Sequence, residues 1–120
     1  MMGRLTTHVL DTAQGRPAAG MLIQLWVFDG QAGEARLIKS THTNADGRCD
    51  EPLLAGEELA AGMYELVFGV GDYFAQQPLP LPNPPFLGLV PVRFAVADSA
   101  AHYHVPLLVS PWAYSTYRGS

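Results

Sequence analysis

Residues 63–70 read Met-Tyr-Glu-Leu-Val-Phe-Gly-Val, and this stretch decides the fold class of the 120-residue chain. Its large apolar side chains recur at every second position from Tyr64 to Val70, while Glu65 and Gly69 occupy the other face. Successive side chains of a β-strand point to opposite sides of a sheet, so a period of two indicates a strand with one buried face. The stretch is therefore predicted to be a half-buried strand.

Similar apolar stretches recur along the chain, separated by many of its 12 glycines and 10 prolines, which is typical of an all-β protein. Residues 21–28 are apolar almost throughout, so both faces of that strand are expected to be covered, one of them as a candidate subunit contact. Short helical turns are expected within 56–61 and 71–77. Eight short strands favour a two-layer sandwich. The predicted strands are 4–10, 20–28, 35–43, 52–54, 62–70, 89–97, 102–109 and 112–118.

The charge of the chain limits its partners. It has 7 basic and 11 acidic side chains, a net charge of −4, and 15% charged residues, where an average soluble domain has about 25%. This balance excludes a phosphate backbone or an anionic lipid surface as a partner, so we expect neither nucleic acid nor membrane binding. So few charges also favour association with further copies of the chain. The length predicts a single domain over residues 1–120.

The chain contains one cysteine, Cys49, which cannot form an intramolecular disulfide and gives no reason to expect an oxidising compartment. Residues 1–8 lack the apolar core of a signal peptide, and no apolar run approaches the roughly 18 residues of a membrane-spanning helix. We therefore expect a cytoplasmic protein.

Residues 78–85 read Pro-Leu-Pro-Leu-Pro-Asn-Pro-Pro, a composition that cannot join a sheet ladder and favours extended polyproline geometry. A stiff connector inside the domain is the favoured interpretation. The alternative is a ligand for a proline-recognition module.

Histidines are the first candidate functional residues, because an unperturbed pKa of about 6.5 suits proton transfer at neutral pH. In the strand 4–10, Leu5 and Val9 occupy the core face, so His8 is predicted to point outward. The same reasoning predicts that His102 and His104 share the outer face of the strand 102–109.

Two histidines on one strand face are also the beginning of some metal sites. No further ligands at suitable spacing accompany His102 and His104, so we expect neither a metal nor another cofactor. His42 is expected to be a solvated surface residue.

A turn and the chain end supply further candidates. Residues 44–47 read Asn-Ala-Asp-Gly, which permits positive φ, and Arg48 follows, where a loop can present a guanidinium to a flat, carbonyl-rich ligand. Taken alone, such an arginine is more often a solvated loop residue. Residues 114–120 hold two tyrosines and an arginine, which by composition favour an ordinary edge strand.

Together these segments resemble a known family. The markers are Thr-His-Val-Leu-Asp at 7–11, Gly-Arg-Pro-Ala at 15–18, Thr-Asn-Ala-Asp-Gly-Arg at 43–48, His-Tyr-His-Val-Pro-Leu-Leu at 102–108 and Tyr-Arg-Gly-Ser at 117–120. On them, nearly the whole chain is similar to the 5-hydroxyisourate hydrolases of the transthyretin-like family. The closing tetrapeptide distinguishes these hydrolases from the hormone-carrying transthyretins.

The resemblance implies a transthyretin-like sandwich of two four-stranded sheets with one short helix, assembled as a homotetramer with substrate clefts where dimers meet. It implies hydrolysis of the small molecule 5-hydroxyisourate to 2-oxo-4-hydroxy-4-carboxy-5-ureidoimidazoline in urate degradation. The proline-rich residues 78–85 depart from the family pattern and are interpreted as a variation in a loop. The implied catalytic residues are His8, Arg48 and His104. The implied substrate-binding residues are Tyr117, Arg118, Gly119 and Ser120.

The reaction itself asks for three chemical roles. Ring opening is an acyl transfer to water, which needs a base for the water, positive charge for the developing oxyanion, and a proton for the leaving nitrogen. His8, Arg48 and His104 suit these roles without a serine or cysteine nucleophile, and which histidine is the base stays open. The rival hypothesis is a small-ligand carrier on the same sandwich, since fold alone does not separate the two.

Overall fold

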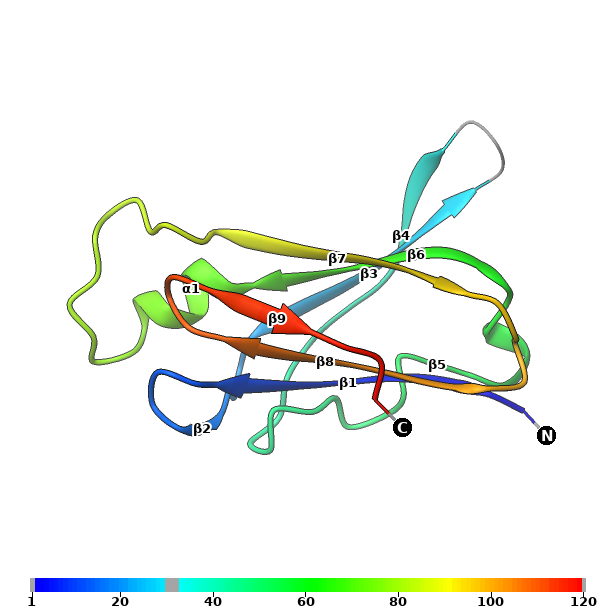
Figure 1. Ribbon diagram of the computed structural model, residues 1–120, viewed down its shortest axis with the longest axis horizontal. Coiled ribbons are helices and arrows are strands. Elements are labelled where there is room, and N and C mark those ends of the chain that lie inside the picture. Colours follow the sequence, from blue (N-terminus) through cyan, green and yellow to red (C-terminus); the bar gives the residue numbers. More distant parts are fainter. Residues whose placement is uncertain (1, 30–32, 120) are drawn as a thin grey trace.

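The alternating stretch around residue 66 forms strand β6 (Gly62–Gly69), in the middle of one of two facing sheets (Figure 1). The computed structural model describes residues 2–29 and 33–119. The other strands are β1 (Arg4–Asp11), β2 (Arg16–Pro17), β3 (Leu22–Asp29), β4 (Glu34–His42), β5 (Leu54–Ala55), β7 (Leu89–Val96), β8 (His102–Val109) and β9 (Tyr114–Thr116). A 3₁₀ turn, η1 (Gly56–Glu58), follows β5, and one short helix, α1 (Val70–Ala75), follows β6. The predicted all-β sandwich with one short helix is confirmed.

One sheet has the strand order β4-β3-β6-β7, and the other has the order β2-β1-β8-β9 with β5 also paired to β1. The short strands β5 and β2 pair with opposite ends of β1, at Leu5↔Leu54 and Leu10↔Pro17. The second sheet thus has one strand more than expected. The sequence did not predict β2, because two residues carry no alternation that a pattern can detect.

The eight predicted strands are all present, with boundaries within two residues at each end. Three predicted strands differ from the structure by two residues. The strand predicted at 20–28 begins at Leu22, and the one predicted at 52–54 forms at 54–55. The strand predicted at 112–118 is shorter at both ends. The last strand shortens to Tyr114–Thr116 because the chain then leaves the β8 ladder. The helical turn expected within 71–77 corresponds to helix α1. The turn expected within 56–61 is the single 3₁₀ turn η1.

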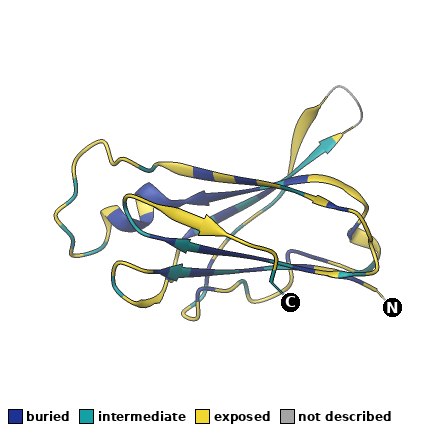
Figure 2. Cartoon of the chain, viewed as in Figure 1, coloured by how far each residue is buried: buried dark blue, intermediate teal, exposed yellow. Residues whose placement is uncertain are grey.

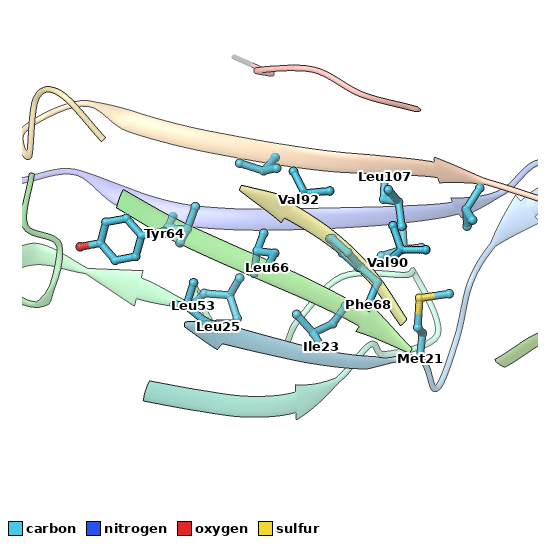
Figure 3. Packing of buried hydrophobic residues seen from close by; sticks show 14 of the residues in the cluster. Met21, Ile23, Leu25, Leu53, Tyr64, Leu66, Phe68, Val90, Val92 and Leu107 are labelled. Atoms are coloured by element: carbon cyan, nitrogen blue, oxygen red, sulfur yellow. The ribbon is translucent and has the colours of Figure 1, made fainter. Parts of the chain in front are cut away.

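The core lies between the two sheets. Figure 3 shows Ile23 and Leu25 of β3, Leu66 and Phe68 of β6 and Leu107 of β8 pointing into this space. All of these side chains are fully buried, as the period of two predicts for β6. Their burial removes apolar surface from water, which stabilises the folded chain.

Strand β3 buries only one face in this chain. Ile23 and Leu25 are buried, whereas Leu22, Trp26 and Phe28 are half-buried, because they point away from the other sheet. The single chain covers one face of 21–28, and cover of the other face by a neighbouring subunit stays a prediction.

The proline-rich segment 78–85 connects α1 to β7, as expected for a connector, and is mostly exposed (Figure 2). Leu79 and Leu81 nevertheless pack against the core. Within residues 2–29 and 33–119, no helix has the length and apolar character needed to cross a membrane.

The pairing that positions the candidate site is the parallel alignment of β1 with β8. Arg4 lies opposite His102, and Thr6 lies opposite His104. Thr6, His8 and His104 are half-buried, while their sequence neighbours Leu5, Thr7, Val9, Tyr103 and Val105 are buried. The predicted outward orientation of the three histidines of β1 and β8 is confirmed.

Candidate active site

The turn at residues 44–47 brings Arg48 against β1. Gly47 has φ +75°, and an added Cβ would lie 2.4 Å from the carbonyl oxygen of Val9, so only glycine fits. The Val9 N–H in turn donates to the Gly47 carbonyl at 2.8 Å. His8 and Arg48 consequently lie opposite each other in an isolated antiparallel bridge.

The same turn orients the His8 ring. Its Nε2 lies 2.9 Å from the Asp46 carbonyl oxygen. A carbonyl only accepts hydrogen bonds, so Nε2 carries a proton in this arrangement. Neutral His8 therefore has its lone pair on Nδ1, where it can accept a proton.

His104 is held from the neighbouring strand. The hydroxyl Oγ1 of Thr6 lies 2.8 Å from Nδ1 of the His104 ring. Burial, then the positive charge of Arg48 and, when His8 is protonated, that of His8, lowers the pKa of His104 from its ordinary value of 6.5. His104 is accordingly neutral at pH 7.

A cavity of about 500 Å³ opens on this outer face of the β1–β8 sheet. Arg48 and His104 both line it, whereas His8 lies beside Arg48 without being a lining residue. The other lining residues are Arg4, Thr6, Thr7, Cys49, Asp50, Glu51, Pro52 and His102. Burial raises the pKa of the Cys49 thiol, which disfavours the nucleophilic thiolate.

The tail that follows β9 docks on β8 (Figure 1). The N–H of Gly119 donates to the carbonyl of His104 at 2.7 Å. A Cβ on Gly119 would lie 2.6 Å from Cδ2 of the His104 imidazole, so this residue packs directly against the ring. Arg118 donates from a guanidinium nitrogen to the carbonyl of His102 at 3.2 Å and lies over the Tyr103 ring.

The four tail residues do not lie together at the cavity. Tyr117 and Arg118 line a separate hollow of about 320 Å³ next to β7. Gly119 contacts a site histidine, and Ser120 lies outside the described residues. Among the described tail residues 117–119 of the single chain, Gly119 is therefore the one that contacts the His104 ring.

Sequence reasoning missed several lining residues, above all Thr6 and Arg4. Their alternation with the core residues indicates that they face outward beside His8, but only the pairing of β1 with β8 shows which histidine they meet. Over residues 2–29 and 33–119, no group of three or more His, Cys, Asp or Glu side chains is placed to hold a metal ion.

Fold and site together define a transthyretin-like β-sandwich with an arginine and two histidines grouped on the outer face of one sheet. The model of the HIUase/Transthyretin family matches residues 5–119. The chain belongs to this family.

Curated relatives match over nearly the whole chain. The chain is 60% identical to 5-hydroxyisourate hydrolase 2 of Rhizobium meliloti (strain 1021), over 98% of this chain and 97% of the relative. It is 62% identical to the 5-hydroxyisourate hydrolase of Mesorhizobium japonicum, over 98% of this chain and 93% of the relative. With relatives of this identity and coverage, the chain is an enzyme of the hydrolase type.

Solved structures share the fold. A crystal structure of (S)-allantoin synthase superposes with a TM-score of 0.92 at 46% identity, over 99% of this chain, which spans only 44% of that one. Sea bream transthyretin in complex with thyroxine superposes with a TM-score of 0.85 at 26% identity, over 97% of this chain and 94% of that one. The sandwich is thus shared by a synthase and by a thyroxine-binding transthyretin, so the fold alone does not specify a function.

Proposed function

We propose that this protein hydrolyses 5-hydroxyisourate to 2-oxo-4-hydroxy-4-carboxy-5-ureidoimidazoline, a step of urate degradation, with water as the nucleophile. The observation that carries the proposal is the grouping of His8, Arg48 and His104, from three distant parts of the sequence: Arg48 and His104 line one cavity, and His8 lies opposite Arg48 beside it. The names of two curated relatives, 60% and 62% identical over nearly the whole chain, supply the substrate.

The reaction balances without a cofactor. The oxygen of water forms a bond to a ring carbonyl carbon while a base takes one of its protons, which yields a tetrahedral oxyanion. The oxyanion then collapses, the bond from that carbon to the ring nitrogen breaks, and the nitrogen takes up a proton. One proton is removed and one is returned, so a proton acceptor and a proton donor suffice.

The side chains supply these functions. The lone pair of His8 on Nδ1 is a proton acceptor, because its Nε2–H is committed to the Asp46 carbonyl. Arg48 carries the fixed positive charge that stabilises an oxyanion and orients a flat, carbonyl-rich ring. Neutral His104 lies at the cavity wall, where it can exchange a proton or a hydrogen bond with the substrate.

The proposed enzyme is a homotetramer in which the cavity is completed by a neighbouring subunit. The cavity is a broad hollow on an outer sheet face, and a small flat substrate binds best where most of its surface is covered. The half-buried apolar residues Leu10 and Leu108, on the same face, support a subunit contact there.

The test adds the purified full chain to freshly generated 5-hydroxyisourate and follows the loss of its ultraviolet absorbance against the spontaneous decay, with the product identified by NMR. We expect strong acceleration that a chelator does not reduce. An unaccelerated decay would reject the hydrolase. Activity that a chelator abolishes and zinc restores would show that the residue roles above are wrong.

The same sample tests the carrier alternative. Thyroxine that binds the chain while 5-hydroxyisourate decays at its spontaneous rate would favour a transthyretin-like binding function instead.

A further inference from the structure

The ring of His104 has one hydrogen-bonding partner within residues 2–29 and 33–119, the hydroxyl of Thr6. The two residues are aligned in the parallel ladder of β1 and β8, so their side chains leave the sheet on the same face. The distance from Oγ1 to Nδ1 is 2.8 Å, which is a short, well-formed hydrogen bond. Both residues line the cavity.

We propose that Thr6 is a positioning residue for the hydrolysis: its hydroxyl donates to Nδ1 of His104, holds the ring as the tautomer with its proton on Nε2, and so presents an N–H donor to the cavity. No role for Thr6 follows from the grouping of His8, Arg48 and His104. The effect of Thr6 on turnover rests on the proposed function, whereas the tautomer can be measured without substrate.

Counting protons among the described residues favours the Thr6 hydroxyl as the donor. A neutral imidazole has one N–H and one lone pair, and a threonine hydroxyl can donate or accept. If Nδ1 carried the proton, the hydroxyl hydrogen of Thr6 would have no acceptor among residues 2–29 and 33–119. If the hydroxyl donates, its hydrogen and the Nδ1 lone pair satisfy each other, and Nε2–H remains for the substrate or water.

The charges around the ring keep it neutral. Arg48 and, when it is protonated, His8 are the groups whose positive charges act on His104. The remaining titratable groups that line the cavity are Arg4, Cys49, Asp50, Glu51 and His102. With Arg48 at this face, a second positive charge on His104 is unfavourable, so the neutral ring and its tautomer govern the chemistry.

The tail restrains the other edge of the same ring. Gly119 packs against Cδ2, opposite the Nδ1 edge that Thr6 holds. A ring held at both edges resists rotation, so the hydroxyl sets the tautomer of a side chain whose orientation is already restricted. His8, by contrast, keeps its lone pair on Nδ1, which makes one histidine an acceptor and the other a donor.

Three variants test the proposal. Thr6→Val removes the hydroxyl with little change of shape and keeps a side chain that strands favour. Thr6→Ser returns a hydroxyl. The matched control is Thr12→Val, which removes another threonine hydroxyl bond from the β1 segment to β8, Oγ1 to the Val109 carbonyl at 3.2 Å, away from the cavity.

The readouts are ¹⁵N NMR of histidine-labelled protein at neutral pH, kcat and KM for 5-hydroxyisourate, and a thermal melt of each sample. In the wild type we expect a bare Nδ1 and a protonated Nε2 on His104. In Thr6→Val we expect mixed tautomers and a kcat lowered roughly tenfold, the scale of one net hydrogen bond, with KM little changed. Thr6→Ser restores both readouts, and Thr12→Val alters neither.

A wild-type His104 with its proton on Nδ1 overturns the proposal. So does a Thr6→Val protein with unchanged tautomer and turnover, or a Thr6→Ser protein as impaired as Thr6→Val. If the folded wild type does not hydrolyse 5-hydroxyisourate, the proposed function fails, and the NMR spectra decide the role of the hydroxyl by themselves.

Discussion

The carbonyl of Asp46 and the hydroxyl of Thr6 determine how the two site histidines can act. His8 meets a group that only accepts, and His104 meets one that can donate. The two imidazoles are identical by residue type, yet their neighbours assign them different nitrogens for chemistry. Variants of single residues therefore test the site most directly.

We expect His8→Ala, Arg48→Ala and His104→Ala each to lower kcat/KM by about a hundredfold or more, the scale of a lost general base or oxyanion-stabilising group. His42→Ala, an exposed histidine on β4, is the control and should change turnover little. The measurement is the ultraviolet decay of 5-hydroxyisourate. Near-normal rates in all three site variants would mean that the chemistry lies elsewhere.

The pKa of His104 provides a prediction about pH. Burial and then the charge of Arg48 lower this pKa from 6.5, so the neutral form that the proposed function uses persists below that pH and is lost only as the pH falls through the lowered value. Arg48→Met removes a positive charge, so the pKa of His104 should rise towards 6.5. NMR titration of the His104 ring measures the change.

Arg4→Met is the matched control for this titration, because Arg4 lines the same cavity but its charge is not among the causes of the shift. A His104 pKa that responds equally to both substitutions, or to neither, would contradict the specific effect of Arg48.

At the scale of secondary-structure elements, the arrangement that bears most on the site is the packing of the tail, residues 117–119, against β8. Over the described residues, its hydrogen bonds to β8 run from the Gly119 N–H to the His104 carbonyl and from the Arg118 guanidinium to the His102 carbonyl, and Arg118 also lies over the Tyr103 ring. The outermost residues of a domain usually contribute little to its stability. We therefore expect the contact of this tail with β8 to matter more for the position of the His104 imidazole than for the stability of the fold.

Deletion of residues 117–120 should reduce hydrolysis strongly while the thermal midpoint stays within a few degrees, since ~1 kcal/mol moves the midpoint of a domain of this size by roughly 4 °C. Gly119→Ala is the sharper companion variant, because its Cβ would meet the His104 ring at 2.6 Å. Turnover, melting and oligomer mass are measured on the same samples.

Unchanged turnover after the deletion would reject a role for the tail in the site. Lost turnover together with dissociation to monomers would show only that the tail supports assembly. Gly119→Ala separates these cases, because it retains all four residues of the tail and alters the contact with the His104 ring.

At the scale of the whole molecule, the surface of the single chain carries many apolar groups. Phe86, Leu89, Trp112 and Tyr117 are each at least half exposed, and only 15% of the residues are charged. Single exposed apolar side chains are normal, but several large ones on a weakly charged surface favour association.

We therefore expect light scattering to give a mass of four chains in solution. A monomeric mass with full hydrolytic activity would contradict a site completed between subunits.

Much of the molecule was predictable from local pattern. The period of two identified β6, β7 and β8 and assigned His8 and His104 to an outer face, because side-chain direction in a strand depends only on position along that strand. Arg48 after the turn was identified on residue type and on the family resemblance. The fifth strand of the second sheet was not predicted, and the single chain covers only one face of β3, because what lies beside or across a sheet is not contained in any local pattern.

The sequence by itself determined the all-β class, the strand faces, and the residue types of the site, since these follow from neighbours in the chain. Only the tertiary structure decided that Thr6 lies beside His104, that Gly119 packs on the same ring, and that Tyr117 lies at another hollow. Thr6 and His104 are 98 residues apart in the sequence. Strand order and register bring such pairs together, and both depend on how the whole chain closes its sheets around one core.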